Sequence, residues 1–186
     1  MPGALYLAGD DVTLRTVEEE DLAFINETIN IREVRLGMTM AGPAPMTATE
    51  SHFEENISDD GSVNLLICVD EDEPAGMIIL FDVDDRRGKA EIGIWVAPDY
   101  QGNGYGTEAA ALVVDHAFQQ RRLHRVLARV LTTNDASARI WENLWFTHEG
   151  TLRESEFLDG EHVGMRYFGL LEDEWDGFDS WQNQDS

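Results

Sequence analysis

The stretch Gln101-Gly102-Asn103-Gly104-Tyr105-Gly106 decides how the rest of this sequence is interpreted. It follows an apolar, strand-like run at 92–96 and leads directly into a helical pattern that begins at Thr107. Three glycines in five residues leave a backbone whose N–H groups can all face one anion. The start of the following helix adds unpaired amides and the positive end of its dipole. A strand, a glycine-rich turn and a helix N-terminus together predict a pyrophosphate-binding site.

Two other nucleotide loops fit this stretch less well. The mononucleotide loop GxxxxGK[ST] requires a lysine after the glycines, and none is present here. Gly104-x-Gly106-x-x-Ala109 does match the dinucleotide fingerprint of an NAD-dependent dehydrogenase. That fingerprint belongs to the first strand of its domain, whereas about a hundred residues precede it here. An acidic residue that ends a second strand about 20 residues further on is also missing.

The pattern Gln-x-x-Gly-x-Gly at 101–106 resembles the coenzyme A pyrophosphate loop of the GNAT (GCN5-related N-acetyltransferase) superfamily. Residues 91–98 resemble the family's preceding strand, which splays from its neighbour to admit the pantetheine, and 107–109 resemble the start of its phosphate-binding helix. Downstream, 134–137 and 144–146 resemble the second half of the cofactor site. The resemblance covers roughly residues 10–172.

Length and composition indicate one globular domain. The 186 residues are 42% hydrophobic and 9% aromatic, and no apolar run approaches the ~18–20 residues of a membrane span. The N-terminus lacks an export signal and Cys68 is the only cysteine, so a cytoplasmic protein without a disulfide is expected. We expect a single acetyltransferase domain over 1–172 and an acidic tail over 173–186. Aromatic residues in that tail favour packing on the body of the chain or on a second copy in a homodimer.

The charge is strongly negative: 37 acidic residues stand against 13 basic ones, for a net charge of −24. Nucleic-acid binding is excluded because it requires neutralisation of phosphates by Lys and Arg. One explanation is an acidic field that attracts cationic amines. The other is a surface adapted to molar salt, since acids occur in every segment and Lys89 is the only lysine. The second explanation predicts a halophilic source, where a Debye length of ~3 Å would abolish long-range steering.

The rest of the chain predicts an α/β protein with alternating strand and helix patterns. Three consecutive strands between 63 and 96 read as an antiparallel meander, and the strand after the long helix should run parallel to 91–96. The resemblance implies the GNAT fold, a twisted, mixed and mostly antiparallel sheet with helices on both faces. The expected strands are 12–15, 63–69, 75–81, 89–96, 125–130, 147–152 and 162–171, and the expected helices are 19–29, about 47–57, 107–120 and 134–144.

The resemblance also implies how acetyl-CoA, the cosubstrate, is bound. Backbone groups of Ile94, Trp95 and Val96 would hold the pantetheine as an added strand. Asn134 would donate to the cofactor arm, although Asn also caps helices well and the two roles stay open. The pyrophosphate would bind to amides of the loop formed by Gln101, Gly102, Asn103, Gly104, Tyr105, Gly106 and Thr107. The five histidines are scattered, so no metal site is expected.

The sequence offers several candidate catalytic groups. Many GNAT enzymes place a tyrosine acid where Trp141 stands here, and an indole N–H is too weakly acidic for that role. Enzymes that acetylate ribosomal-protein N-termini are similar to this sequence in carrying Asn-x-x-Ser, so Ser137 is either the acid or hydrogen-bond donor to the thiolate, or only a first-turn helix residue. Glu156 and Glu91 are the candidate general bases, with Glu156 preferred.

These features predict transfer of acetyl from acetyl-CoA to a primary amine by direct attack, without a covalent enzyme intermediate. The opening at 14–22 resembles the ribosomal-protein branch, so the expected acceptor is a protein N-terminal α-amine, including that of a ribosomal protein. A polyamine or aminoglycoside acetyltransferase is the alternative enzyme, and a non-catalytic acyl-CoA sensor is the alternative from another class. Acceptor specificity is expected to depend on residues 36–46 and 153–162.

Overall fold

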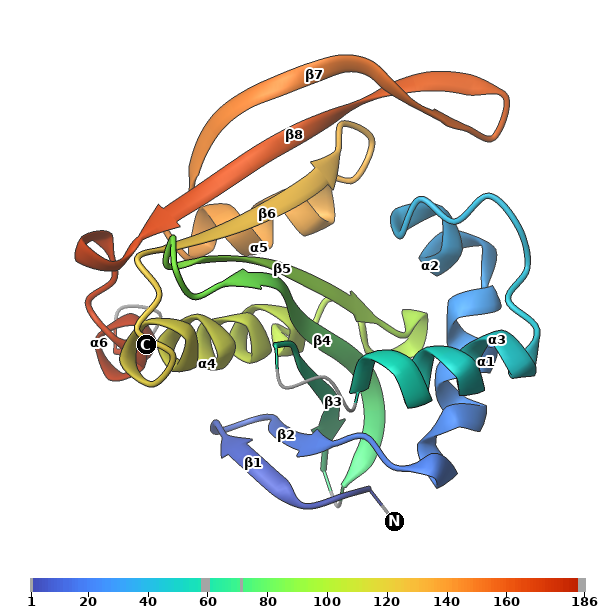
Figure 1. Ribbon diagram of the computed structural model, residues 1–186, viewed down its shortest axis with the longest axis horizontal. Coiled ribbons are helices and arrows are strands. Elements are labelled where there is room, and N and C mark those ends of the chain that lie inside the picture. Colours follow the sequence, from blue (N-terminus) through green and yellow to red (C-terminus); the bar gives the residue numbers. More distant parts are fainter. Residues whose placement is uncertain (1, 58–60, 71, 184–186) are drawn as a thin grey trace. The chain divides into compact units, whose positions relative to one another are not determined.

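The computed structural model describes residues 2–57, 61–70 and 72–183 (Figure 1). It is a mixed α/β fold with one sheet in the strand order β1-β2-β3-β4-β5-β6-β8-β7. The strands are β1 (Leu5–Ala8), β2 (Thr13–Thr16), β3 (Val63–Val69), β4 (Glu73–Asp84), β5 (Lys89–Val96), β6 (Arg125–Leu131), β7 (Thr147–Leu158) and β8 (Glu161–Leu171). The helices are α1 (Leu22–Asn30), α2 (Arg32–Gly37), α3 (Met46–His52), α4 (Tyr105–Gln119), α5 (Asp135–Asn143) and α6 (Phe178–Gln182).

The predicted element types are correct, and the differences lie in extent and in three additions. Strands β3 and β5 have the predicted bounds, whereas β4 and β7 run several residues further. Strand β1 and helices α2 and α6 were not predicted. Strand β1 has only exposed and half-buried residues, so its sequence lacks the alternation that burial of one face imposes. Only one residue of α2, Val34, is buried, and a helix with so small an apolar face has no clear 3.6-residue period.

The chain divides into two compact units, unit 1 (Met1–Ile79 and Ile94–Ala109) and unit 2 (Leu80–Gly93 and Ala110–Ser186). The predicted division into a domain over 1–172 and a tail over 173–186 stays a prediction. In unit 1, β2 pairs antiparallel with both β1 and β3. Cys68 is fully buried, and this burial raises the pKa of its thiol to about 12, in agreement with an inert core thiol. The core cluster of unit 1 is Val17, Leu22, Ile25, Ile29, Val34, Leu66, Cys68, Met77 and Trp95.

Two asparagines on α1 fix the loop that precedes α3. Asn30 Nδ2 donates to the carbonyl of Ala44 at 2.8 Å, and Asn30 Oδ1 accepts from the Ala44 amide at 2.9 Å. Asn26, one helical turn earlier, donates to the same carbonyl at 3.0 Å and to Thr49 Oγ1 at 2.8 Å. The spacing i, i+4 puts both amides on one face of α1. The segment predicted to border the acceptor is therefore an ordered part of unit 1.

In unit 2, β5 and β6 are parallel, as predicted, with Lys89 opposite Arg125 and Glu91 opposite Leu127. Strand β8 then pairs antiparallel with β6 on one side and with β7 on the other. Its pairing with β6 begins only at Met165, whereas its pairing with β7 reaches the turn after Leu158. The β7–β8 hairpin therefore runs past the end of β6, and β7 is the last strand of the sheet.

The aromatic tail folds back on unit 2. Trp175 and Trp181 are 6% and 8% exposed. The indole N–H of Trp175 donates to Asp115 Oδ1 at 3.0 Å, and that of Trp181 donates to the carbonyl of Asn143 at 3.3 Å. Of the two expected packings of the tail, Trp175 and Trp181 adopt the one on the body of the chain, and the homodimer stays a prediction. The last three residues of the tail, 184–186, lie outside the described residues.

Along the stretches of chain that the structure describes, no helix has the length and apolar character needed to cross a lipid bilayer.

Candidate functional site

The glycine loop of unit 1 has the backbone that its sequence predicts. Gly102 and Gly104 have φ values of +80° and +86°, in the left-handed region that L side chains rarely adopt. A Cβ at either position would meet open space, so these glycines serve backbone conformation rather than close packing. The carbonyl of Gly104 accepts from the amides of Thr107 at 2.9 Å and Glu108 at 3.1 Å, which starts α4. The loop is thus a sharp turn directly onto a helix N-terminus.

The polar side chains of this loop bind its own carbonyls. Gln101 Nε2 donates to the carbonyl of Val96, at the end of β5, at 2.9 Å. Asn103 Nδ2 donates to the carbonyls of Tyr100 at 3.2 Å and Gln101 at 3.3 Å. Among the described residues, none accepts a hydrogen bond from the backbone amides of 102–106. Because backbone amides need acceptors, a row of unoccupied ones at a helix start can bind an anion, and the pyrophosphate assignment of this loop stays a prediction.

A carboxylate that the sequence analysis did not single out anchors this helix start. Glu108 Oε1 accepts from the amides of Asp10 at 2.5 Å and Asp11 at 3.2 Å, in the turn between β1 and β2. The side chain is 8% exposed, and burial raises the pKa of its carboxyl. Glu108 therefore joins the first turn of α4 to a turn almost a hundred residues earlier. The local signal was an acid in the first turn of a helix whose middle, residues 109–114, is apolar.

On β5, the side chain and the backbone of Trp95 have separate surroundings. The ring is 8% exposed within the core cluster, and its centroid lies 6.0 Å from that of Phe24. The side chain thus fixes the strand in unit 1. Of the predicted cofactor residues Ile94, Trp95 and Val96, the central one can therefore contribute only backbone groups, as a pantetheine bound like an added strand requires.

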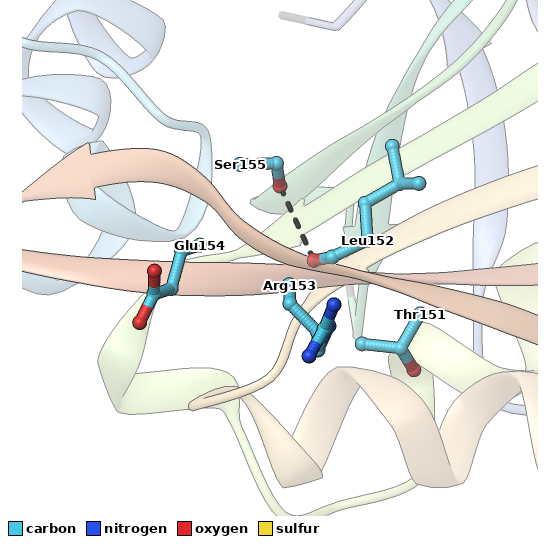
Figure 2. A pocket seen from close by; sticks show the side chains of 5 residues that line it. All are labelled: Thr151, Leu152, Arg153, Glu154 and Ser155. Atoms are coloured by element: carbon cyan, nitrogen blue, oxygen red, sulfur yellow. Dashed lines mark hydrogen bonds between the residues drawn. The ribbon is translucent and has the colours of Figure 1, made fainter.

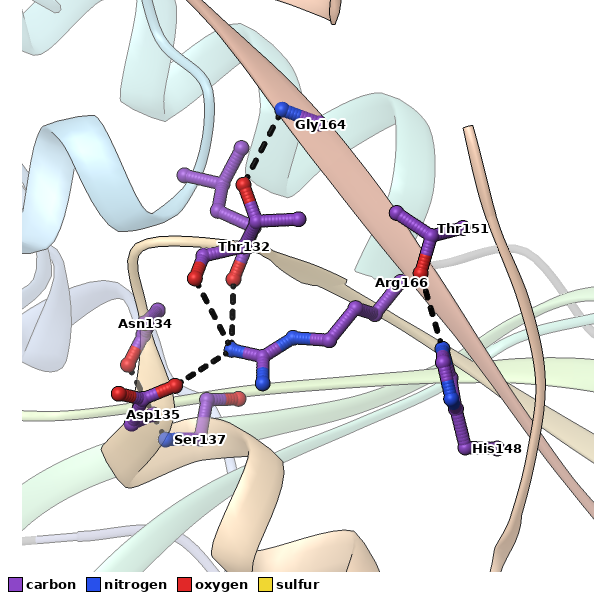
Figure 3. Close-up of polar contacts among 9 residues, drawn as sticks. Thr132, Asn134, Asp135, Ser137, His148, Thr151, Gly164 and Arg166 are labelled. Carbon is purple, nitrogen blue, oxygen red and sulfur yellow. Dashed lines mark hydrogen bonds and ion pairs between the residues drawn. The ribbon is translucent and has the colours of Figure 1, made fainter. Parts of the chain in front are cut away.

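In unit 2, Asn134 and Ser137 lie together at the start of α5 (Figure 3). Asn134 Oδ1 accepts from the amide of Ser137 at 3.0 Å, so Asn134 caps this helix. The cap uses only the oxygen of the side chain, and the Nδ2 group is still a donor. The helix-capping alternative for Asn134 is thus correct, and it does not remove the other role. Ser137, in the same first turn, is a half-buried residue.

An arginine on β8 holds the junction between β6 and α5. Arg166 Nη2 donates to the carbonyls of Leu131 at 3.2 Å and Thr132 at 3.3 Å, and to Asp135 Oδ1 at 2.9 Å (Figure 3). Arg166 was not predicted as a site residue, because its partners lie 31–35 residues away in the chain and no local pattern points to them.

The two candidate bases have different environments. Glu91 Oε1 accepts from Arg129 Nε at 2.5 Å, across the parallel pair β5–β6, and the Glu91 side chain is 15% exposed. This hydrogen bond raises the pKa of Arg129. Glu156 is half-buried on β7 opposite Val163, and within the described part of the chain it makes no ion pair. Glu91 is thus engaged by a guanidinium and Glu156 is not, and which of the two carboxylates acts as the base stays a prediction.

Trp141, at the position of the family's tyrosine, is a core residue. It is 2% exposed, and its ring centroid lies 5.2 Å from that of Phe146. Its indole N–H is buried and has no hydrogen-bond partner among the described residues. Trp145, where the family has glycine, has φ +63° and packs on Trp175 at 5.5 Å between centroids. These departures from the family pattern are therefore packing features of unit 2.

A hollow of about 640 Å3 lies beside β7, lined by the five consecutive residues Thr151, Leu152, Arg153, Glu154 and Ser155 (Figure 2). The pairing with β8 passes from Leu152–Met165 directly to Glu156–Val163, so residues 153–155 bulge opposite a single residue, Gly164. Glu154 takes φ +52° in this bulge. The hollow thus lies along the exposed strand β7, at the place where residues 153–155 have no pairing partner on β8.

The structure groups the predicted site residues into two sets and leaves two carboxylates apart. Unit 1 brings Ile94–Val96 together with the loop 101–107, and unit 2 brings Asn134 together with Ser137. Glu91 lies on β5, three residues before Ile94, where it pairs with Arg129, and Glu156 lies on β7. Across residues 2–57, 61–70 and 72–183, no group of three or more His, Cys, Asp or Glu side chains is arranged to hold a metal ion.

Comparison with known proteins is consistent with this geometry. The model of the Acetyltransferase (GNAT) domain matches residues 11–147. The chain is 28% identical over 185 residues to the "Putative ribosomal N-acetyltransferase YdaF" of Bacillus subtilis (strain 168), covering 90% of this chain and 95% of that protein. It is 27% identical over 151 residues to spermidine N(1)-acetyltransferase of Escherichia coli (strain K12), covering 81% of each.

The fold is also that of a solved enzyme. The crystal structure of spermidine N-acetyltransferase from Vibrio cholerae in complex with CoA and spermine superposes with a TM-score of 0.84 at 23% identity, and the match covers 89% of this chain and 98% of that one. The predicted fold class is confirmed.

Proposed function

Because the chain belongs to the GNAT acetyltransferase family and is an acetyl-CoA-dependent N-acetyltransferase, we propose that its acceptor is the N-terminal α-amine of a protein, with a ribosomal protein as the first candidate. The observation that carries this proposal is the hollow bordered by Thr151–Ser155. An extended peptide has backbone groups that can pair with an exposed, locally unpaired strand, whereas a small amine has none. The similarity to YdaF, which covers 90% of this chain, supports the same acceptor class.

In this proposal the two sets of residues divide the binding of acetyl-CoA. The vacant amides of 102–106 bind the pyrophosphate, with Gln101 and Thr107 bounding the loop, and the backbone of Ile94–Val96 binds the pantetheine. Asn134 Nδ2 donates to the cofactor arm, and the Ser137 hydroxyl donates to the departing thiolate. The amine attacks the thioester carbonyl directly, so no enzyme nucleophile is needed.

Glu156 is the general base in this scheme, and its removal tests the assignment. An α-amine has a pKa of roughly 7.7–8.0, so it is partly neutral near pH 7–8, and Glu156 accepts, directly or through water, the proton that the nitrogen of the neutral amine loses as the amide forms. We expect Glu156→Gln to lower kcat at least about tenfold with little change in acetyl-CoA affinity. Glu91→Gln is the matched control, because its carboxylate is already paired with Arg129. Unchanged turnover in Glu156→Gln would remove this carboxylate from the mechanism.

A polyamine is the second candidate acceptor. The net charge of −24 attracts polycations, and the spermidine N(1)-acetyltransferase of Escherichia coli is 27% identical over 81% of this chain. A polyamine would use the acidic surface without requiring the strand-like border of the hollow.

The composition supports a separate proposal, that the surface is adapted to molar salt. Acidic residues outnumber basic ones 37 to 13, with a single lysine. At low ionic strength the unscreened repulsion among these charges destabilises the folded state. We therefore expect the protein to unfold when it is dialysed from 2–4 M KCl, roughly, into buffer of about 0.05 M ionic strength, as circular dichroism would report. Full folding in dilute buffer would contradict the adaptation.

Acetyl-CoA turnover tests the acceptor class directly. Peptides with Ser, Ala, Thr and Met N-termini, spermidine and an aminoglycoside would be offered together in molar KCl, and products identified by mass spectrometry. The proposal predicts acetylation of a peptide α-amine. Transfer to spermidine alone would overturn the acceptor and retain the reaction.

A further inference from the structure

The junction between β6 and α5 carries Asn134 and Ser137, and one guanidinium holds it. We propose that Arg166 is a positioning residue for acetyl transfer, which keeps Asn134 and Ser137 in their working orientation through its contacts with the segment between Leu131 and Asp135. This inference rests on the proposed function, since it takes the roles of Asn134 and Ser137 from it.

The contacts of Arg166 span the whole junction. Arg166 lies on β8 opposite Val130 of β6. From there, Nη2 reaches the last residue of β6 (Leu131, 3.2 Å), the residue after it (Thr132, 3.3 Å) and the first residue of α5 (Asp135, 2.9 Å). Strand, loop and helix thus share one donor. A shift of α5 along its axis would break at least one of these contacts.

A second tie from β8 prevents the junction from moving independently. The amide of Thr132 donates to the Gly164 carbonyl at 2.9 Å, and the amide of Gly164 donates back to Thr132 Oγ1 at 3.1 Å. A Cβ at Gly164 would lie 2.8 Å from the Leu152 carbonyl oxygen and 3.0 Å from Thr132 Cγ2, so only glycine allows this approach. Strand β8 therefore holds the junction at residues 164 and 166 (Figure 3).

Stability alone does not account for the charge of Arg166. A cation at a helix N-terminus opposes the helix dipole. The compensating carboxylate, Asp135, has a side chain that is 74% exposed, and exposed pairs contribute little. In addition, Arg166 Nε is buried and has no acceptor in the described part of the chain. The Arg166 guanidinium therefore stays at a helix N-terminus although one of its buried N–H groups has no acceptor. An unfavourable arrangement of this kind indicates a functional requirement at the junction.

The expected consequence of losing Arg166 is a selective loss of turnover. The pyrophosphate is assigned to the glycine loop of unit 1, which shares no residue with this junction, so CoA affinity should change little. Orientation of the thioester depends on Asn134 and Ser137, and a misplacement of about 1 Å can cost ~100-fold in rate. Arg166 should therefore affect kcat much more than the affinity for CoA.

The test compares Arg166→Met with Arg125→Met. Arg125 lies on the same strand pair, opposite Leu171 at the far end of β6, and pairs with the exposed Glu149. We expect Arg166→Met to lower kcat by about 30-fold while the Kd for CoA, measured by calorimetry, changes less than about threefold. Arg125→Met should retain the wild-type kcat. Arg166→Lys keeps the charge but not the planar fork, and should fall in between.

A double-mutant cycle separates positioning from a general structural role. If Arg166 acts through Ser137, then Arg166→Met/Ser137→Ala should lose no more kcat than the worse single variant, whereas independent effects would multiply. Wild-type kcat in Arg166→Met, multiplicative losses in the cycle, or a kcat loss matched by a fall in the folded fraction would each overturn the proposal. If Arg166→Met does not fold, the same criteria apply to Arg166→Lys.

The acceptor assignment can fail without affecting this test. Kinetics are measured with the amine that the wild-type enzyme acetylates best, whether peptide or spermidine. If the enzyme acetylates only spermidine, the acceptor proposal is wrong, and kinetics of the Arg166 variants with spermidine still test the role of Arg166.

Discussion

The glycine loop before α4 and the junction before α5 are both strand-to-helix connections, yet they differ in how the backbone amides at the helix N-terminus are hydrogen-bonded. Before α4, the chain turns through Gly102 and Gly104 and leaves its amides without acceptors among the described residues. Before α5, Asn134 Oδ1 occupies the amide of Ser137. A helix start binds an anion only where its own chain has not already satisfied the amides. The two connections therefore differ in whether the amides at the helix start have acceptors within the chain. We call the connection before α4 the open junction and the connection before α5 the closed junction.

The acids in the first turns differ in the same sense. Both helices carry one there, Glu108 in α4 and Asp135 in α5. Glu108 is 8% exposed and bonds to the amides of Asp10 and Asp11, which keeps its negative charge turned toward other donors. Asp135 is mostly exposed and faces Arg166. The open helix start is thus the one whose acid is buried and fully occupied.

The largest expected effect comes from placing a charged side chain in the open junction before α4. Gly104→Asp would place a carboxylate against the pyrophosphate and a side chain at φ +86°, so CoA affinity should fall at least about 100-fold, or ~3 kcal/mol. Gly160→Asp is the matched control, because Gly160 has φ +88° and equally open space in the β7–β8 turn. Calorimetric titration with CoA measures both. Retained CoA binding in Gly104→Asp would contradict the assignment of the pyrophosphate to the open junction.

A smaller effect is expected at the closed junction, where two substitutions separate cap from donor. Asn134→Asp keeps the capping oxygen and removes the Nδ2 donor, so stability should change by less than about 0.5 kcal/mol while the KM for acetyl-CoA rises about tenfold. Asn134→Ala removes both, and should in addition lower the free energy of unfolding by about 1 kcal/mol. Urea unfolding and steady-state kinetics give the two quantities. An unchanged KM in Asn134→Asp would leave Asn134 as a cap alone.

The buried acid of the open junction predicts a pH dependence of stability. Burial raises the pKa of Glu108 in the folded state above its ordinary value of about 4.5, so the folded protein holds this proton more tightly than the unfolded chain. The free energy of unfolding should therefore fall as pH rises from about 4.5 through the raised value. Glu108→Gln keeps an oxygen acceptor and does not titrate, so its stability should decline less over this range. Urea titrations between about pH 4 and 8 measure the difference, and parallel curves would contradict it.

The smallest effect is expected at the other end of α5. Trp145 holds a left-handed conformation, φ +63°, that costs a bulky residue about 1–2 kcal/mol. Trp145→Gly would relieve this strain and would lose a ring pair with Trp175 worth about 0.5–1.5 kcal/mol, besides the greater entropy of glycine in the unfolded chain. These contributions nearly cancel, so the free energy of unfolding should change by less than about 1 kcal/mol. A loss above ~2 kcal/mol in urea unfolding would show that the ring pair outweighs the strain.

The open junction could be predicted from the sequence and the closed one only in part. A glycine pattern between a strand and a helix is local, and so is an asparagine at a helix start. The contacts of Arg166 and Glu108 are not local: they join residues 31–35 and 97–98 positions apart, and no spacing rule reports them. The same limit explains why the packing of the tail could not be predicted. The indole of Trp175 donates a hydrogen bond to Asp115, which lies 60 residues earlier in the chain.

The placement of the tryptophans has a spectroscopic consequence. Four of the five, Trp141, Trp145, Trp175 and Trp181, belong to unit 2, and only Trp95 belongs to unit 1. Intrinsic fluorescence will therefore follow mainly the melting of unit 2. A variant that retains Trp95 as its sole indole would instead give an optical signal from β5, the strand whose backbone is assigned to the pantetheine, so that occupancy by the cofactor could be read without any enzymatic assay.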